Sequence, residues 1–92
     1  MSIKTYTKDP QAFLDYSIDW SAWLADNETI VTSTWAADSA DLTLSLLAND
    51  GTLTTVWIAG GEAGKDYLVT NTITTVDGRI DERSITLTCE QR

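Results

Sequence analysis

A pair of strand-forming segments around an Asp77-Gly78 turn constrains the fold of this chain most. Residues 65–75 and 80–89 are rich in Thr and β-branched residues. Asp-Gly between such segments is a strong hairpin signal, because glycine adopts positive φ without steric cost. In each segment every second residue lies on one mostly apolar face: Tyr67, Val69, Asn71 and Ile73, then Ile85, Leu87 and Cys89. We therefore expect a long antiparallel hairpin with one face in the core and a hydroxyl-rich face opposite.

The rest of the chain repeats this strand pattern. Four more segments alternate apolar and polar residues or have strand composition, namely 14–20, 29–35, 42–46 and 53–58. Turn residues such as Asn49-Asp50-Gly51 separate them, and no helical period is visible. Short strands at regular spacing are typical of two packed antiparallel sheets. The sequence therefore predicts an all-β fold, a small antiparallel β-sandwich of six to seven strands, whose seventh edge strand would come from residues 2–7.

One tyrosine refines this fold prediction. Tyr67, preceded by Gly64-Lys65-Asp66 and followed by an alternating strand, resembles the tyrosine corner of immunoglobulin-like domains. In that motif the hydroxyl hydrogen-bonds the backbone a few residues upstream. Immunoglobulin-like topology is therefore predicted ahead of a jelly roll or small barrel. Trp35 and Trp57, in the middle of strands, are expected as core anchors beside Tyr67, and Cys89 is expected as a buried, unreactive thiol.

The length of 92 residues fits a single domain. We assign residues 9–92 to one β-sandwich domain and residues 1–8 to an N-terminal arm. The arm is mostly polar with one aromatic residue, Tyr6, and it is either a frayed terminus or a segment that orders on another chain. No signal peptide or long apolar run is visible, which predicts synthesis in a cytoplasm without export by the general pathway.

The composition disfavours several classes of function. A net charge of −8 argues against nucleic-acid and membrane partners, since both need clustered Lys or Arg. The sequence has no His, which excludes the usual general base, the Ser-His-Asp arrangement and the commonest zinc ligand. Its single Cys excludes a cluster of thiolate ligands. No glycine loop of phosphate-binding type is present. We therefore predict no catalytic residue and no cofactor. Asp77, Asp81 and Glu82 at the hairpin tip could hold calcium, but a solvated acidic turn is favoured and no metal site is predicted.

Trp20 and Trp23 are the remaining features of interest. They lie three residues apart at a strand end, where they either cap the core or anchor an interface or a sugar. With the hairpin-tip residues and the arm aromatic, they complete the set of expected interface residues, which is Tyr6, Trp20, Trp23, Asp77 and Arg79.

Several segments resemble one bacteriophage family. Residues 9–24 contain Asp-Pro, then Leu-Asp-Tyr-Ser, an apolar residue, Asp-Trp and a second Trp-Leu. This order is similar to the opening of a family of small tailed-phage proteins described as fibre–tail adaptors or virion-structural proteins. Residues 54–61, 67–75 and 78–87 also resemble it, so the resemblance covers most of the chain from residue 9 onward.

The resemblance implies a non-enzymatic connector. Such a protein would join tail or neck components to tail fibres through protein–protein contacts, as a homo-oligomeric ring or in several copies. Its partners would be other phage tail, neck or fibre proteins. It would be made in the bacterial host cytoplasm and reside in the tail or neck region of the virion. The alternatives are a capsid decoration protein and a carbohydrate-binding β-sandwich module, the latter with Trp20 or Trp23 in an exposed row.

Overall fold

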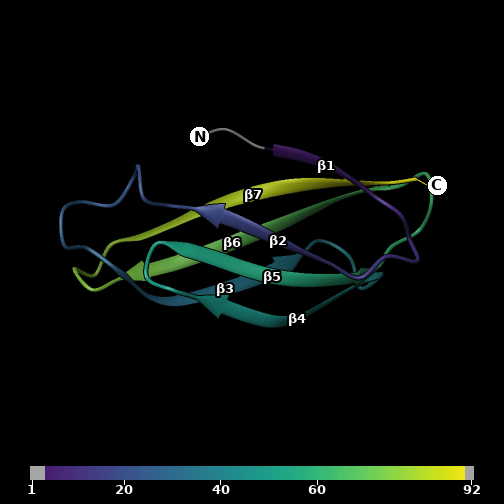
Figure 1. Cartoon of the computed structure of the whole chain (residues 1–92). Helices are drawn as coiled ribbons and strands as arrows, with labels where there is room; N and C mark the ends of the chain where they lie inside the picture. Colours follow the sequence, from purple (N-terminus) through teal and green to yellow (C-terminus); the bar gives the residue numbers. More distant parts are fainter. Residues whose placement is uncertain (1–3, 91–92) are drawn as a thin grey trace.

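The chain folds into two β-sheets packed face to face (Figure 1). The computed structural model describes residues 4–90. One sheet has the strand order β1-β7-β6-β3 and the other β2-β5-β4. The strands are β1 (Lys4–Lys8), β2 (Leu14–Asp19), β3 (Ile30–Ala37), β4 (Leu42–Asn49), β5 (Leu53–Gly60), β6 (Asp66–Thr75) and β7 (Ile80–Cys89). No helix in the described part of the chain is long and apolar enough to cross a membrane.

The strand order is that of an immunoglobulin-like sandwich. The neighbours β2-β5-β4 correspond to strands B-E-D of that fold, and β3-β6-β7 correspond to C-F-G. The predicted sandwich and its topology are thus confirmed. Residues 4–8 supply the seventh edge strand, but β1 pairs with β7 in parallel, with Tyr6 opposite Leu87, so the sheets are not wholly antiparallel. The remainder of the expected arm, residues 1–3, lies outside the described residues.

The hairpin predicted from the Asp-Gly signal is the longest paired unit. β6 and β7 run antiparallel from the Asp66–Thr88 pair to the Thr74–Ile80 pair. Gly78 closes the turn with φ of 85°, and the Thr75 amide donates to the Arg79 carbonyl at 2.9 Å. The expected inward residues are all buried. Their regular alternation fixes the register, since a slip of one residue would turn every one of them to solvent.

A buried amide joins the two sheets. Asn71 of β6 is fully buried, and its Oδ1 accepts hydrogen bonds from Trp20 Nε1 at 3.0 Å and Thr54 Oγ1 at 2.7 Å. Its Nδ2 donates to Ser33 Oγ and to the Thr34 carbonyl, both at 2.9 Å. Ser33 and Thr34 lie on β3 beside β6, whereas Thr54 and Trp20 belong to the facing layer. All four bonds an amide can make are therefore formed, which offsets its burial.

The tryptophans depart partly from expectation. Trp35 lies in the core, but Trp57 lies on the outer face of the three-stranded sheet, so its assignment as a core anchor is corrected. The reason is the period of two: Val56 and Ile58 are fully buried, and Trp57 between them must point outward. Trp20 is the tryptophan that fills the core, because it continues the inward series of β2.

Tyr67 forms the predicted corner. Its hydroxyl accepts a hydrogen bond from the Glu62 amide at 2.9 Å and donates to Asp41 Oδ2 at 2.9 Å. The first bond pins the β5–β6 connection, and the second ties it to the turn before β4. Lys65 adds ion pairs to both carboxylates, at 3.1 Å to Glu62 and 3.8 Å to Asp41. Cys89 is buried nearby as a free thiol, and burial raises its pKa.

Lys8 anchors β1 to the sandwich. Its side chain is fully buried, with Nζ donating to the Gly60 carbonyl at 2.7 Å and the Asp9 carbonyl at 3.0 Å. Burial lowers the pKa of this amine. Because Gly60 ends β5, the contact connects the last residue of β1 with the opposite sheet. Residues 4–8 are therefore part of the folded body of the chain.

Replacing Asn71 with Leu tests the buried amide. Leucine is larger and offers neither donor nor acceptor, so the variant leaves the Trp20 N–H without its partner and takes one partner each from the Thr54 hydroxyl and the Thr34 carbonyl. Each buried unsatisfied group costs about 1–3 kcal/mol, so we expect a loss of about 3 kcal/mol or more in the free energy of unfolding. Urea unfolding followed by tryptophan fluorescence measures it. Thr72→Ala, on the outer face of the same strand, should change stability by less than about 0.5 kcal/mol.

Candidate protein-binding surface at the hairpin end

Three of the expected interface residues lie together at one end of the sandwich. Asp77 and Arg79 belong to the β6–β7 turn, which lies with the β2–β3 loop at the left end of Figure 1. Trp23 of that loop packs against Arg79. Trp20 lies beneath them, fully buried, so the expectation that it forms an interface is wrong. Tyr6 lies apart on β1, half-buried, with its ring edge-on to Tyr16 at 5.2 Å.

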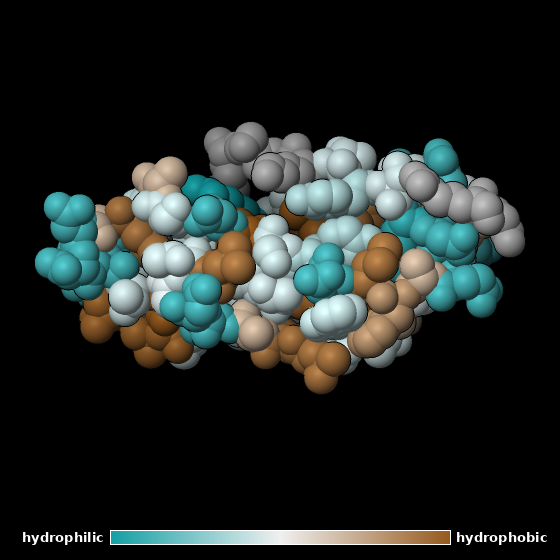
Figure 2. All heavy atoms as spheres, viewed as in Figure 1, coloured by the Kyte–Doolittle hydropathy of each residue, from teal (hydrophilic) through white to brown (hydrophobic). Residues whose placement is uncertain are grey.

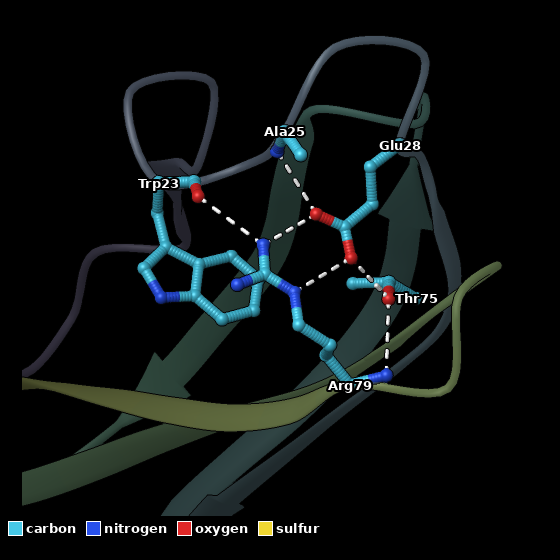
Figure 3. Close-up of polar contacts among 5 residues, drawn as sticks. All are labelled: Trp23, Ala25, Glu28, Thr75 and Arg79. Atoms are coloured by element: carbon cyan, nitrogen blue, oxygen red, sulfur yellow. Dashed lines mark hydrogen bonds and ion pairs between the residues drawn. The ribbon is translucent and has the colours of Figure 1, made fainter.

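A buried carboxylate organises this end. Glu28, just before β3, is 3% exposed although it is charged. Its Oε1 accepts from the Ala25 amide at 2.9 Å and from Arg79 Nη2. Its Oε2 accepts from Thr75 Oγ1 at 2.6 Å and from Arg79 Nε at 2.8 Å. Figure 3 shows the carboxylate between the loop above and the hairpin below. Four donors thus satisfy both oxygens, as a buried charge requires.

Arg79 links the hairpin turn to the β2–β3 loop. Its guanidinium donates hydrogen bonds to the Glu28 carboxylate from Nε and Nη2, and Nη2 also donates to the Trp23 carbonyl at 3.3 Å. The same guanidinium lies over the Trp23 ring, 4.1 Å from the centroid (Figure 3). A planar guanidinium can form a forked ion pair and stack on a ring at once, which a lysine cannot. The arginine side chain is 46% exposed, so one side of this cluster reaches solvent.

The cluster favours the ionised carboxylate. Hydrogen bonds from Arg79, then from Thr75 and the Ala25 amide, lower the pKa of Glu28 from 4.5 to about 2. The Glu28 carboxylate correspondingly raises the pKa of Arg79. Neither group can exchange a proton near neutral pH. The pair is therefore a structural tie and is unsuited to acid–base chemistry.

Exposed apolar side chains surround this tie. Val31 is 56% exposed, Val76 57% and Ile80 70%. They belong to the same end, because the Val76 amide donates to the Thr29 carbonyl at 2.9 Å and Ile80 pairs with Thr74 beside β3. We call this region the hairpin-end surface; it consists of Trp23, Val31, Val76, Asp77, Arg79 and Ile80. Aromatic residues and arginine within an apolar patch are the composition that protein interfaces favour.

Catalytic and metal chemistry find little support at this surface. Asp81 Oδ1 accepts from the Glu82 amide at 2.8 Å, and Asp77 is an exposed turn residue. Within residues 4–90, no three His, Cys, Asp or Glu side chains converge as a metal site would require. Trp20 is buried and the Trp23 ring is covered by Arg79, so these two do not form the exposed row that a carbohydrate-binding module would need.

Glu28 is the functional-site residue that the sequence does not reveal. It follows an Asp26-Asn27 turn and looks like one more solvated acid. Its partner Arg79 is 51 residues away, so no local pattern connects them. Asn71 does leave a signal, because it is the one amide side chain in the inward series of β6.

Comparison with known proteins assigns the family. Residues 8–88 match the family model described as Podophage GP4 fiber-tail adaptor protein gp77. The chain belongs to this fiber-tail adaptor family. It is therefore a phage structural adaptor that links tail to fibres, and its place is the virion tail. The match begins at the residue that ends β1 and continues almost to the end of β7. No individual curated protein matches the sequence.

A solved structure supports the fold of this adaptor. The chain is similar to the solution structure of the PKD domain from the KIAA 1837 protein, with a TM-score of 0.54 and 18% identity. The similarity covers 98% of this chain and 81% of that domain. At this identity the likeness concerns the fold alone, a sandwich of immunoglobulin-like type.

Glu28→Gln tests the buried ion pair through pH. The folded-state pKa of Glu28 is about 2, below its ordinary 4.5, so the ionised group stabilises the fold fully above about pH 4.5. That stabilisation is lost as the pH falls from 4.5 towards 2. We expect the variant to melt at a lower temperature than wild type at pH 6 and to lose less of its stability between pH 4.5 and 2. Thermal unfolding by circular dichroism across this range measures both effects.

Asp38→Asn is the control for this measurement. It removes one exposed carboxylate that makes none of the Glu28 bonds, so it should keep the wild-type loss of stability on acidification. A Glu28→Gln profile that runs parallel to wild type over the whole range would contradict a stabilising role for the ionised pair.

Proposed function

We propose that the protein is a non-enzymatic connector that binds a tail, neck or fibre protein through the hairpin-end surface. Family membership supports the role of connector. The choice of surface rests on one observation: the Glu28–Arg79 ion pair fixes the β6–β7 turn, next to which Val76 and Ile80 are exposed to solvent. A turn fixed before binding loses little conformational entropy when a partner docks. Asp77 at the tip adds charge that a basic partner would complement.

The acidic character of the chain supports hetero-association. At −8, two free copies repel one another, whereas a basic partner is attracted. We propose that several copies act together, as a ring or in repeated positions around the tail or neck. Several modest contacts then sum to a durable assembly. Residues 1–8 are proposed as a further contact at the β1 edge, the free side of the four-stranded sheet.

The absence of enzymatic activity is part of the proposal. The sequence has no His, and the single Cys is buried with a raised pKa. The most perturbed carboxylate, Glu28, is fixed by four hydrogen bonds and stays ionised. None of these groups is arranged as a nucleophile with its base.

Val76→Asp tests the docking surface. The substitution puts a charge on the exposed turn without touching the ion pair, so the purified chain should melt within a few degrees of wild type. Burial of an unpaired charge in an interface is costly, so we expect at least about tenfold less of the variant chain in assembled particles. The measurement is quantitative mass spectrometry of particles grown in a host that supplies the variant in place of the phage copy.

Leu46→Asp is the matched control. Leu46 is 66% exposed at the edge strand β4, and its φ of 52° suits Asp at least as well as Leu. It should assemble like wild type. Normal incorporation of Val76→Asp, or a loss confined to Leu46→Asp, would contradict the hairpin-end surface. Imaging the particles also separates a tail adaptor from a capsid decoration protein by position.

A further inference from the structure

The outer face of the three-stranded sheet carries a second aromatic group, away from the hairpin end. Phe13 is 49% exposed and packs against Trp57 with ring centroids 5.1 Å apart. Leu14, next to Phe13, is 43% exposed. Trp57 lies there because its strand buries Val56 and Ile58 on the other side. The core therefore does not need the pair, and its ring surface is available to a partner.

The charges around this pair have one sign. β2, β4 and β5 contain no Lys or Arg, while Asp15 and Asp19 point outward from β2. Asp15 is the strand partner of Trp57, which brings their side chains within about 5 Å at Cβ. Among the ion pairs of residues 4–90, none involves Asp15. Figure 2, which views this sheet from outside, shows neutral and hydrophobic residues across its middle and hydrophilic ones mainly at the two ends.

The basic side chains that the structure describes are engaged elsewhere. Lys8 is buried, Lys65 pairs with Glu62 and Asp41, and Arg79 pairs with Glu28. Arg83 lies over the Trp20 ring at 4.3 Å and donates to the Asp19 carbonyl at 3.3 Å. No described cation is therefore placed to neutralise the outer face at Asp15.

Two other tryptophans of the molecule already have an arginine stacked on the ring. Trp23 carries the Arg79 guanidinium and Trp20 carries that of Arg83, at 4.1 and 4.3 Å from the ring centroids. Trp57 is the partly exposed tryptophan over which no arginine of the described residues lies. With Asp15 beside it, an incoming guanidinium would meet an aromatic face and a carboxylate together.

We propose that Phe13, Asp15 and Trp57 form a docking site for an arginine-bearing segment of another protein. A second copy is a poor occupant, because β2, β4 and β5 of that copy offer no Lys or Arg that could pair with Asp15. Nucleic acid and anionic lipid are repelled for the same reason. The site is distinct from the hairpin-end surface and does not depend on it. It gives the adaptor a separate face for a second, basic partner.

A peptide titration tests the site on the purified chain. The probes are the acetylated and amidated peptide Leu-Arg-Val-Arg-Leu, the same peptide with Glu for Arg, and the sugar maltohexaose. We expect the arginine peptide to shift the indole N–H resonance of Trp57 and the amides of residues 13–15, with weaker binding as salt is raised. Trp57→Ala should weaken binding by about tenfold and Asp15→Asn by about threefold.

Matched variants and probes give every outcome a meaning. Asp38→Asn changes the net charge as Asp15→Asn does, and Leu68→Ala removes an exposed apolar side chain from the other sheet. Both should bind as wild type. Equal shifts with the glutamate peptide would indicate a plain apolar patch, and shifts with maltohexaose alone would indicate a sugar site. Shifts at Trp23 in place of Trp57 would mean that the arginine peptide binds at another site. No shifts at millimolar peptide would mean that the chain does not bind it. Each of these four results overturns the proposal.

Discussion

The four hydrogen bonds of the Asn71 amide are the constraint on which the rest of the structure depends. A polar group at the centre of an apolar layer costs least where every bond is made, so these four bonds favour one alignment of the two sheets. It also fixes Trp20, whose ring packs edge-on against Trp23 at 5.5 Å. Trp23 in turn supports Arg79. The hydrogen bond from Trp20 to Asn71 in the core therefore helps to position Trp23 and Arg79 at the surface.

Local patterns in the sequence were enough for much of the fold. The β6–β7 hairpin and the Tyr67 corner could be predicted because the residues that define them lie within a few positions of one another. Trp57 departs from the expectation because the period of its strand, in which Val56 and Ile58 take the inward face, outweighs the apolar character of its large side chain. The site was harder, because the burial of Glu28 depends on an arginine that only the tertiary fold brings near.

The basic side chains of the adaptor that the structure describes are engaged within its own fold. Buried lysine, ion pairs and stacked arginines leave a surface dominated by carboxylates, while two separate regions expose apolar and aromatic groups. In such a molecule long-range attraction selects for basic partners and speeds encounter, and short-range apolar contact holds them. Association should therefore depend on ionic strength more in its rate of formation than in its lifetime.

The parallel pairing of β1 with β7 has a mechanical consequence. The first and last strands lie side by side from the Lys4–Ile85 pair to the Lys8–Cys89 pair and run in the same direction. Pulling the two ends of the chain apart would slide these strands along each other, so all their hydrogen bonds would carry the load together. An antiparallel pair pulled from adjacent ends would open one bond at a time. A connector whose neighbours attach near its termini could thus bear tension along its length without unzipping.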